Sequence, residues 1–469
     1  MKRQLLIMAL LGVCALTGCT RYKEQLSMPA PVVVERQDEG EISPAQAKAG
    51  EEVSQTEQET EAVDLKELRK PVKVKGIYLT AAAAGNEENM DKVIEKIDKT
   101  EINAVVIDFK DDSGRLTCEV SSELLNEVGI VEVYIEDMPG LLKKLKDHGI
   151  YTIARVVAFR DPGLAEKKPE WSLKLADGSQ YRDRQGLAWI NPYKHEVWEY
   201  LVEVGKEAKR LGFDEVQFDY IRFSTDRGIG DVVYDEADTK GRGKTEIITE
   251  FVDYVYEELT AEGLFVSADV FGAIINSRVD AESVGQNYGE MASHLDYICP
   301  MLYPSHYGDG NFGIEHPDTQ PYDTMLAALG ASVKALEPYA EEGSHQAVVR
   351  PWLQDFTASY LKNYISYGPK EVRAQIQAVY DAGYDEWILW NAGANYSWGG
   401  LKTEEEAAAE MEKIAEERQR KEDAEKGIPE ITGPLPQIEE IEMPTLPEDI
   451  APAVSPDGES VVLPQMLPN

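Results

Sequence analysis

The chain has 469 residues, of which 43% are hydrophobic, so it can bury the core of one large domain or of two ordinary ones. Its 86 acidic residues against 47 Lys and Arg give a formal net charge of −39, which argues against nucleic-acid binding and against a basic membrane-binding surface. At long range this charge favours neutral or cationic partners over anionic ones. The 4 Cys and 6 His provide neither a disulfide scaffold nor paired His ligands, so we expect no metal and no cofactor.

Residues 1–19 have the pattern of a bacterial export signal. Lys2 and Arg3 precede an apolar run from Leu5 to Leu16 that is too short to span a bilayer comfortably. The run ends in LTGC, which resembles a lipobox, the motif whose Cys is lipidated and becomes the new N-terminus. We therefore predict a lipoprotein of the bacterial cell surface, anchored to the membrane through Cys19. The alternatives are a signal peptide that is cleaved without lipidation and a short anchor that is retained.

The remaining ends of the chain have compositions that do not predict a packed core. Residues 20–71 are rich in Glu, Gln, Ala, Pro and Ser without apolar periodicity, which predicts a disordered acidic tether. Residues 403–426 predict a charged, solvent-facing helix, and residues 427–469 predict a disordered tail rich in Pro and acids. We expect these charge runs to be solvated and without a partner, and residues 72–402 to form the folded domain.

Within that domain, short and nearly continuous apolar runs predict strands that are covered on both faces. The eight predicted strands are Lys75–Ala81, Asn103–Lys110, Tyr151–Phe159, Glu215–Phe223, Phe265–Gly272, Tyr297–Pro304, Val348–Phe356 and Glu386–Gly393.

Most gaps between these runs carry the apolar spacing of amphipathic helices. Val197, Leu201, Val204 and Ala208, for example, recur at intervals of three and four before Gly212. Alternating strands and helices predict an α/β fold with a parallel sheet, and eight such units fit a (β/α)8 TIM barrel. A doubly wound open sheet is the alternative, but no Gly-rich phosphate loop follows the first strand.

Long connections follow the third, fourth and sixth predicted strands, at about 160–195, 224–246 and 305–323. In TIM barrels the loops that follow the strands build the active site. These loops are rich in aromatic, Gly, Asp and Asn residues, a composition that suits a sugar ligand. Five aromatic side chains could stack on sugar rings or, alternatively, anchor the loops by packing: Trp171, Trp189, Tyr193, Tyr307 and Phe312.

The C-terminal ends of the predicted strands are unusually polar for buried segments, and burying an unpaired carboxylate costs several kcal/mol. Several acids at one end of a barrel therefore indicate a site. The residues that we assign to this site lie on seven of the strands, and they are Asp108, Lys110, Arg155, Asp219, Tyr220, Arg222, Asp269, Tyr303, Trp352, Gln354, Asp355 and Asn391.

Alternation along the strands selects the catalytic pair. Val216 and Phe218 share one face of their strand, so Asp219 and its neighbour Gln217 face the barrel interior. The same reasoning predicts that Asp269 faces inward on the next strand. Neighbouring strands lie about 4.8 Å apart, so the two carboxyls are expected side by side. Carboxyls about 5 Å apart suit a retaining glycosidase, and repulsion between them raises one pKa, as a general acid requires. We assign Asp219 as nucleophile or stabiliser and Asp269 as proton donor.

The other ten residues are assigned to substrate binding. On the seventh strand we expect Arg350, Trp352 and Gln354 to face the barrel interior. In the alternative, the other alternate side chains face inward, and Asp355 is one of them. Arg155 either contacts the sugar or forms a structural ion pair with Asp108.

Motifs of other hydrolases do not occur: the sequence has no GxSxG elbow of serine hydrolases and no HExxH zinc motif.

Five segments carry a family resemblance: VKGIYLTA, the block from WINPYKHEVW to FDYIRFSTD, ICPMLYPSHY, VRPWLQDF and ILWNAG. They resemble a bacterial family of glycoside hydrolase-like barrels that is classed as a domain of unknown function. The resemblance covers about residues 72–400, and FDYIRF at 218–223 is its most specific motif. It implies a TIM barrel and a hydrolase of O-glycosidic bonds.

A more distant similarity is to the α-amylase-like barrels, in which the nucleophile Asp ends strand four. Asp219 matches that position, but Gln217 stands where those enzymes have a basic residue, and Asp269 stands where they have a Glu. Asp355 corresponds only loosely to their third carboxylate. These departures give no ground for α-glucan specificity.

Together these features predict a surface-anchored glycoside hydrolase that acts on an extracellular or cell-wall polysaccharide. The alternative is a non-catalytic carbohydrate-binding lipoprotein on a TIM-barrel scaffold. A lyase or deacetylase is less well supported, because the sequence lacks the metal ligands that such chemistry usually uses.

Overall fold

The computed structural model describes residues 64–340 and 344–427. The predicted signal, the lipidation site at Cys19, most of the tether and the tail from residue 428 lie outside these ranges. Within them, no helix is long and apolar enough to cross a bilayer.

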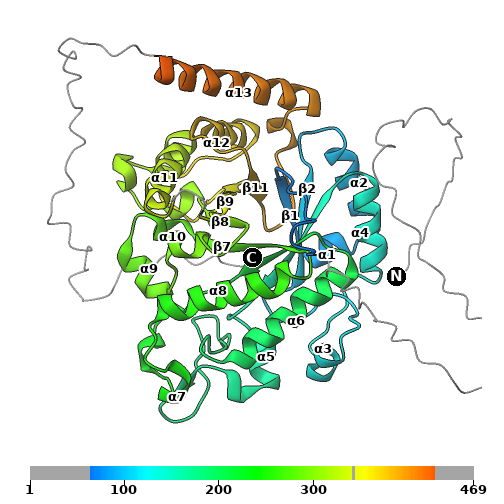
Figure 1. The fold of residues 1–469 in the computed structure, drawn as a ribbon, viewed down its shortest axis with the longest axis vertical. Helices are drawn as coiled ribbons and strands as arrows, with labels where there is room; N and C mark the ends of the chain where they lie inside the picture. Colours follow the sequence, from blue (N-terminus) through cyan, green and yellow to red (C-terminus); the bar gives the residue numbers. More distant parts are fainter. Residues whose placement is uncertain (1–63, 341–343, 428–469) are drawn as a thin grey trace, which may run out of the picture. The chain divides into compact units, whose positions relative to one another are not determined.

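Parallel strands form a closed barrel surrounded by helices, which confirms the predicted (β/α)8 fold (Figure 1). The seventh position is shared by two short strands, β9 and β10, and closure comes from pairing of β10 with both β8 and β11. In barrel order the strands are β1 (Lys75–Leu79), β2 (Ala104–Lys110), β3 (Tyr151–Val157), β5 (Glu215–Asp219), β7 (Phe265–Phe271), β8 (Tyr297–Met301), β9 (Val348–Val349) with β10 (Trp352–Gln354), and β11 (Trp387–Trp390).

Helices connect these strands on the outside of the barrel. The longest of them, α6 and α8, pack on β5 and β7 through the apolar stripes that their spacing predicted. Helix α6 ends at Gly212, whose φ of 114° is in the left-handed region that glycine adopts without strain. The helices are α1 (Ala81–Ala84), α2 (Glu87–Ile97), α3 (Glu123–Val128), α4 (Met138–Asp147), α5 (Pro162–Lys167), α6 (His195–Leu211), α7 (Glu236–Thr239), α8 (Lys244–Thr260), α9 (Arg278–Val284), α10 (Tyr288–Ala292), α11 (Pro321–Leu336), α12 (Pro369–Asp381) and α13 (Glu404–Gly427).

The barrel has two apolar regions, one on each face of the strands. Residues such as Val216, Phe218 and Ala268 belong to the large cluster between strands and helices. A smaller cluster fills the barrel interior and includes Val106, Ile153 and Trp352. Because side chains alternate between these regions, Asp219 and Asp269 face the interior, as the alternation predicted.

Two loops that follow barrel strands are joined by a small antiparallel sheet. Strand β4 (Lys174–Leu175), in the connection after β3, pairs with β6 (Val232–Val233), in the connection after β5. The long connections of the sequence are therefore ordered, and they stand together at the C-terminal ends of the strands.

Strand β5 ends four residues earlier than predicted, at Asp219. Tyr220 has a φ of 55°, which is incompatible with an extended strand and turns the chain out of the sheet. The FDYIRF motif therefore divides into a strand end, a strained turn and the start of a loop. This turn aims the residues after Asp219 across the mouth of the barrel.

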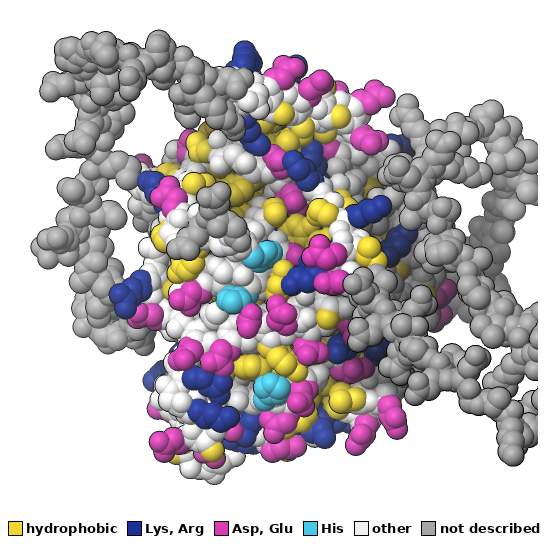
Figure 2. Space-filling model, in the orientation of Figure 1, with side chains coloured by type: hydrophobic (Ala, Val, Ile, Leu, Met, Phe, Trp, Pro, Cys, Tyr) yellow, Lys and Arg dark blue, Asp and Glu magenta, His cyan; other side chains and the backbone are white. Residues whose placement is uncertain are grey.

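Both flanking segments contact the barrel more than their composition predicted. Arg69, within the predicted tether, forms an ion pair of 2.6 Å with Asp296 and lies over the ring of Phe265. Helix α13 packs Met411 and Ile414 against the core, so one side of it is not solvent-facing. Elsewhere on the surface, acidic and basic side chains are interspersed, as Figure 2 shows for one face.

Candidate active site

Asp219 ends β5 and is held by two hydrogen bonds from Arg155 of β3 to one of its carboxylate oxygens. Nε and Nη2 of Arg155 donate to Oδ2 of Asp219 at 3.0 and 2.6 Å, and the backbone N–H of Tyr220 donates to its Oδ1 at 2.6 Å. Both side chains are buried. Charge-assisted pairs of this kind fix a carboxylate in position, so the orientation of Asp219 is set before any ligand binds.

Asp269 lies on the neighbouring strand β7, whose Ala268 pairs with Phe218 of β5. Its Oδ1 accepts a hydrogen bond of 2.6 Å from Nε1 of Trp352 on β10. Burial, and next the charge of Asp219, raise the pKa of the Asp269 carboxyl well above its usual value, and the Trp352 hydrogen bond opposes that shift. These effects favour the protonated form of Asp269, which is the form that a general acid requires.

A third interior carboxyl, Asp108 on β2, shares Arg155 with Asp219. Nη1 of Arg155 donates to Asp108 at 2.7 Å and to Asp112 at 3.3 Å. The hydroxyl of Tyr78 donates to Asp108 at 2.6 Å. Of the two interpretations of Arg155, the structure therefore shows the ion pair with Asp108, and the same side chain also positions Asp219.

Asp108 makes stability depend on pH. Burial raises its pKa to about 6, against the opposing effect of Arg155. Because the folded-state pKa exceeds the unfolded value, stability falls as pH rises from about 4 through about 6, by on the order of 3 kcal/mol. We expect the loss of stability measured by urea unfolding between pH 4 and 7 to be larger by this amount in the wild type than in Asp108→Asn. The same pH dependence in both proteins would contradict the assignment.

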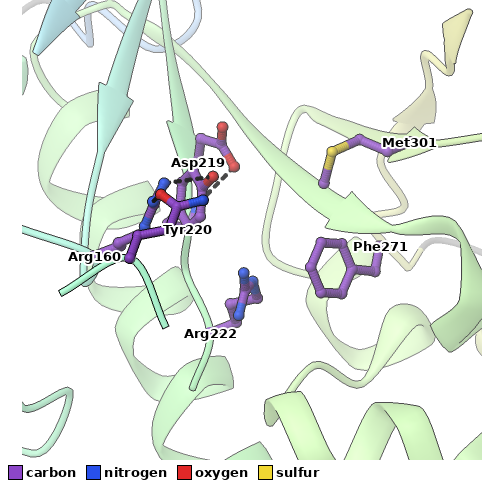
Figure 3. Close-up of a pocket in the computed structure, with 7 residues that line it drawn as sticks. Arg160, Asp219, Tyr220, Arg222, Phe271 and Met301 are labelled. Carbon is purple, nitrogen blue, oxygen red and sulfur yellow. Dashed lines mark hydrogen bonds between the residues drawn. The ribbon is translucent and has the colours of Figure 1, made fainter. Parts of the chain in front are cut away.

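A small pocket opens beside Asp219 at the end of the barrel (Figure 3). Tyr220 forms part of its wall, and the hydroxyl of this residue accepts a hydrogen bond of 2.9 Å from Arg160. Burial and the neighbouring Asp112 raise the pKa of Tyr220 to about 12, so the hydroxyl keeps its proton. The pocket combines polar and apolar walls, and its lining residues are Arg160, Gln185, Asp219, Tyr220, Arg222, Phe271 and Met301.

Besides Tyr220, two predicted substrate-binding residues lie at or near this pocket. Arg222 is one of its lining residues. Tyr303 is buried in the interior cluster, where Asp269 and Asp219 influence its ionisation. Trp352 contacts Asp269 directly and therefore has a positioning role.

Four other predicted substrate-binding residues have structural partners. Lys110 is fully buried, pairs with Asp161 at 2.6 Å and donates to the carbonyl of Val157. Gln354 belongs to the inward-facing set that the sequence analysis favours for this strand, but its side chain connects Asp318 to the backbone of Ser305. These two side chains hold loops of the barrel mouth together, so we no longer assign them to the substrate. The same holds for Asp355 and Asn391, which anchor the loop after β11.

Asp355 provides a test of this reassignment. Its carboxylate accepts hydrogen bonds from the backbone N–H and the hydroxyl of Ser397 at 2.7 and 2.6 Å. In Asp355→Ala both donors lose their partner, which we expect to lower the free energy of unfolding by about 1–3 kcal/mol. Urea denaturation measures this, with Glu315→Ala as control because that side chain is 87% exposed. Equal stability of both variants would contradict the anchoring role.

The predicted aromatic platforms include two side chains that are packed as loop anchors. Trp189 is 1% exposed and donates through Nε1 to Asp183 at 3.1 Å. Tyr193 is also buried and packs against Phe223 and Tyr234. Trp189 nevertheless contributes to the site, because its ring lies under the guanidinium of Arg222, 5.0 Å from its centre.

The prediction missed Arg160, Gln185, Phe271 and Met301 of the pocket. Arg160 directly follows the predicted third strand, so its position was a usable signal. Phe271 and Met301 end β7 and β8 as ordinary apolar residues, and nothing in the sequence distinguishes them from core. Among the described residues, no group of three or more His, Cys, Asp or Glu side chains is placed to hold a metal ion.

A closed barrel that places two buried carboxyls on neighbouring strands, one of them bound by an arginine, has the carboxyl pair that a glycoside hydrolase requires. Residues 76–396 match the family described as "Putative glycosyl hydrolase domain", and the chain belongs to this family. This membership confirms the predicted family and enzyme class. No curated protein matches the chain.

Solved structures provide three further comparisons. A hypothetical protein from Ruminiclostridium thermocellum ATCC 27405 is 39% identical, with coverage of 41% of this chain and 97% of that one and a TM-score of 0.38. The PgaB (BpsB) glycoside hydrolase domain from Bordetella bronchiseptica is 12% identical, with coverage of 69% and 95% and a TM-score of 0.47. The α-galactosidase TtGalA from Thermus thermophilus is 12% identical, with coverage of 74% and 62% and a TM-score of 0.43.

Proposed function

We propose that this protein hydrolyses O-glycosidic bonds of an extracellular or cell-wall polysaccharide, with Asp219 and Asp269 as its catalytic residues. The observation that carries the proposal is the division of roles between adjacent carboxyls. Arg155 holds Asp219 through charge-assisted hydrogen bonds, and burial beside Asp219 raises the pKa of Asp269. Glycosidases need one carboxyl that acts as a carboxylate and one that donates a proton.

The proposed reaction runs in two steps. The Asp219 carboxylate bonds to the anomeric carbon while the bond from that carbon to the leaving oxygen breaks, and Asp269 gives its proton to the leaving oxygen. Water then attacks the anomeric carbon and releases Asp219, while Asp269 takes the proton from that water. The positions of the two carboxyls on neighbouring strands support this retaining course over an inverting one, because inversion needs room for a water between them.

A glycan-release screen tests the proposal. The full chain and Asp219→Asn are incubated with bacterial cell-wall and exopolysaccharide preparations, and released reducing ends are measured. Asp253→Asn is the matched control, because its side chain is half-exposed on α8. Release by the wild type and the control but not by Asp219→Asn would support the proposal. Equal release by all three would mean that the site is elsewhere, and binding without release would favour the carbohydrate-binding alternative.

We further propose that the protein is exported and lipid-anchored through Cys19. The LTGC motif after a charged and then apolar segment supports this proposal. In cells, the wild type is expected to incorporate labelled fatty acid and to sediment with membranes, whereas Cys19→Ser incorporates none. Cys118→Ser, which alters a buried Cys of the barrel, is the control and is expected to remain labelled. Labelling that persists in Cys19→Ser would exclude this anchor.

A further inference from the structure

Arg222 is a buried cation without a carboxylate partner. It is 4% exposed, yet among the described residues its one hydrogen bond goes from Nη1 to the carbonyl of Phe223, at 2.9 Å. A guanidinium carries five N–H donors and stays charged at all physiological pH values. Burying such a charge costs several kcal/mol unless a counter-charge or acceptors compensate it. The remaining donors of Arg222 therefore lack the partners that its burial calls for.

Three aromatic rings enclose this guanidinium and leave one side open. Its central carbon lies 5.0 Å from the ring centre of Trp189, 5.2 Å from that of Tyr220 and 4.4 Å from that of Phe271. Figure 3 shows the guanidinium at the open centre of the pocket, between Tyr220 and Phe271. The rings fix the position of the cation, and Arg222 lines the space that a ligand would fill.

The other charged groups of the pocket already have partners. Asp219 is bound by Arg155, and Arg160 contacts Asp183 at 3.3 Å and Tyr220 at 2.9 Å. Asp226, a buried acid in the same loop as Arg222, accepts hydrogen bonds from the backbone and side chain of Arg184. Arg222 is thus the pocket cation whose charge no contacting carboxylate balances.

From this arrangement we infer that Arg222 binds a carboxylate of the substrate, and that the enzyme acts on polysaccharides containing acidic sugars. A guanidinium and a carboxylate form two parallel charge-assisted hydrogen bonds, which would satisfy donors that are now unused. The apolar walls of Phe271 and Met301 suit the C–H face of a sugar ring beside that charge. Because Asp219 lines the same pocket, the acidic sugar unit lies at or next to the bond that is cleaved.

This inference reverses the expectation from composition, which favoured neutral or cationic partners. The net charge of −39 describes the whole chain, including both end segments. At physiological salt its field is screened over about 8 Å. A buried guanidinium that contacts the ligand acts within that distance, so local contacts decide the preference.

The inference rests on the proposed function for the reaction, but binding tests it separately. Fragments of an acidic bacterial exopolysaccharide are compared with the same fragments after carboxyl reduction, which converts each carboxylate into a neutral hydroxymethyl group. Affinity for the full chain is measured by calorimetry at 0.15 M salt. We expect carboxyl reduction to weaken binding roughly tenfold or more, as the loss of charge-assisted hydrogen bonds predicts. Equal affinity for both sets would overturn the inference, and this comparison needs no protein variant.

Variants then assign the effect to Arg222. Arg222→Gln is expected to lose the preference for unreduced fragments, whereas Arg278→Gln keeps it, because that arginine is 90% exposed on α9. A preference that survives in a folded Arg222→Gln would overturn the assignment. Inorganic phosphate that competes as well as the fragments would overturn the acidic-sugar reading, because the site would then bind any anion.

Asp219→Asn separates the two proposals, because it removes turnover and leaves Arg222 in place. Preferential binding of acidic fragments by this variant, with no release by the wild type, would reject the hydrolase and support the binding site. Release of products from neutral glycans, with no preference for acidic fragments, would support the proposed hydrolase activity and reject the proposed carboxylate-binding role of Arg222.

Discussion

Replacing Asp269 with Asn is expected to lower kcat on polysaccharide by about 10²–10⁴-fold, which is the usual contribution of a general acid. The sugar that leaves is a poor leaving group unless its oxygen is protonated, and the amide of Asn cannot supply that proton. An aryl glycoside of the same sugar leaves as a stabilised phenolate and needs little protonation. The loss on the aryl substrate is therefore expected to be much smaller, and comparing kcat for the two substrates measures the difference.

The pH profile provides a second readout of the same residue. Burial and the charge of Asp219 raise the pKa of Asp269, so its acid form persists above the range of an ordinary carboxyl. Activity of the wild type on polysaccharide falls as pH rises through that elevated pKa. This alkaline limb is expected to be absent in Asp269→Asn. If the variant loses equal activity on both substrates and retains the limb, the proton donor is another group.

Most of the barrel could be predicted because its strands are buried on both faces. Apolar runs such as Ala104–Ile107 in β2 do not depend on distant contacts for their recognition. The strand ends were harder to locate, because they depend on backbone geometry. The apolar pattern continues through Tyr220 and Ile221, but the left-handed φ of Tyr220 ends β5 at Asp219.

The interior pair Asp219 and Asp269 was predictable for a local reason. Alternation within each strand places them on the inner face, and strand order makes the two strands neighbours. Asp355 and Lys110 look equally functional in the sequence. Their partners, Ser397 and Asp161, lie in loops, and the alternation of side chains along a strand does not predict where loops lie. Only the structure therefore shows that Asp355 and Lys110 already have polar partners.

Arg222 illustrates the opposite case. Its sequence position, three residues after Asp219, marked it as a site residue but did not indicate its role. The structure adds that three aromatic rings surround it and that no carboxylate contacts it. The missing partner, more than the residue type, is what points to an anionic ligand.

At the opposite end of the barrel interior, Arg350 is expected to be the residue whose loss costs most stability. Its side chain is fully buried and bridges Glu215 and Glu386, with contacts of 2.8 Å to each. The guanidinium also lies 3.7 Å from the ring centre of Tyr297. Burial raises the pKa of Glu215, and Arg350 opposes that shift. The cation therefore stabilises two carboxylates that would otherwise be buried without compensation.

Arg350→Met removes this compensation and is expected to lower the free energy of unfolding by about 3–5 kcal/mol, measured by urea denaturation at pH 7. Arg278→Met, at an exposed arginine of α9, is the control and is expected to change stability little. Adding Glu215→Gln and Glu386→Gln to Arg350→Met removes the stranded charges, so this triple variant should regain part of the loss. If the triple variant is less stable than Arg350→Met, hydrogen bonds of the glutamates, such as that from Tyr151 to Glu215, outweigh the cost of their buried charge.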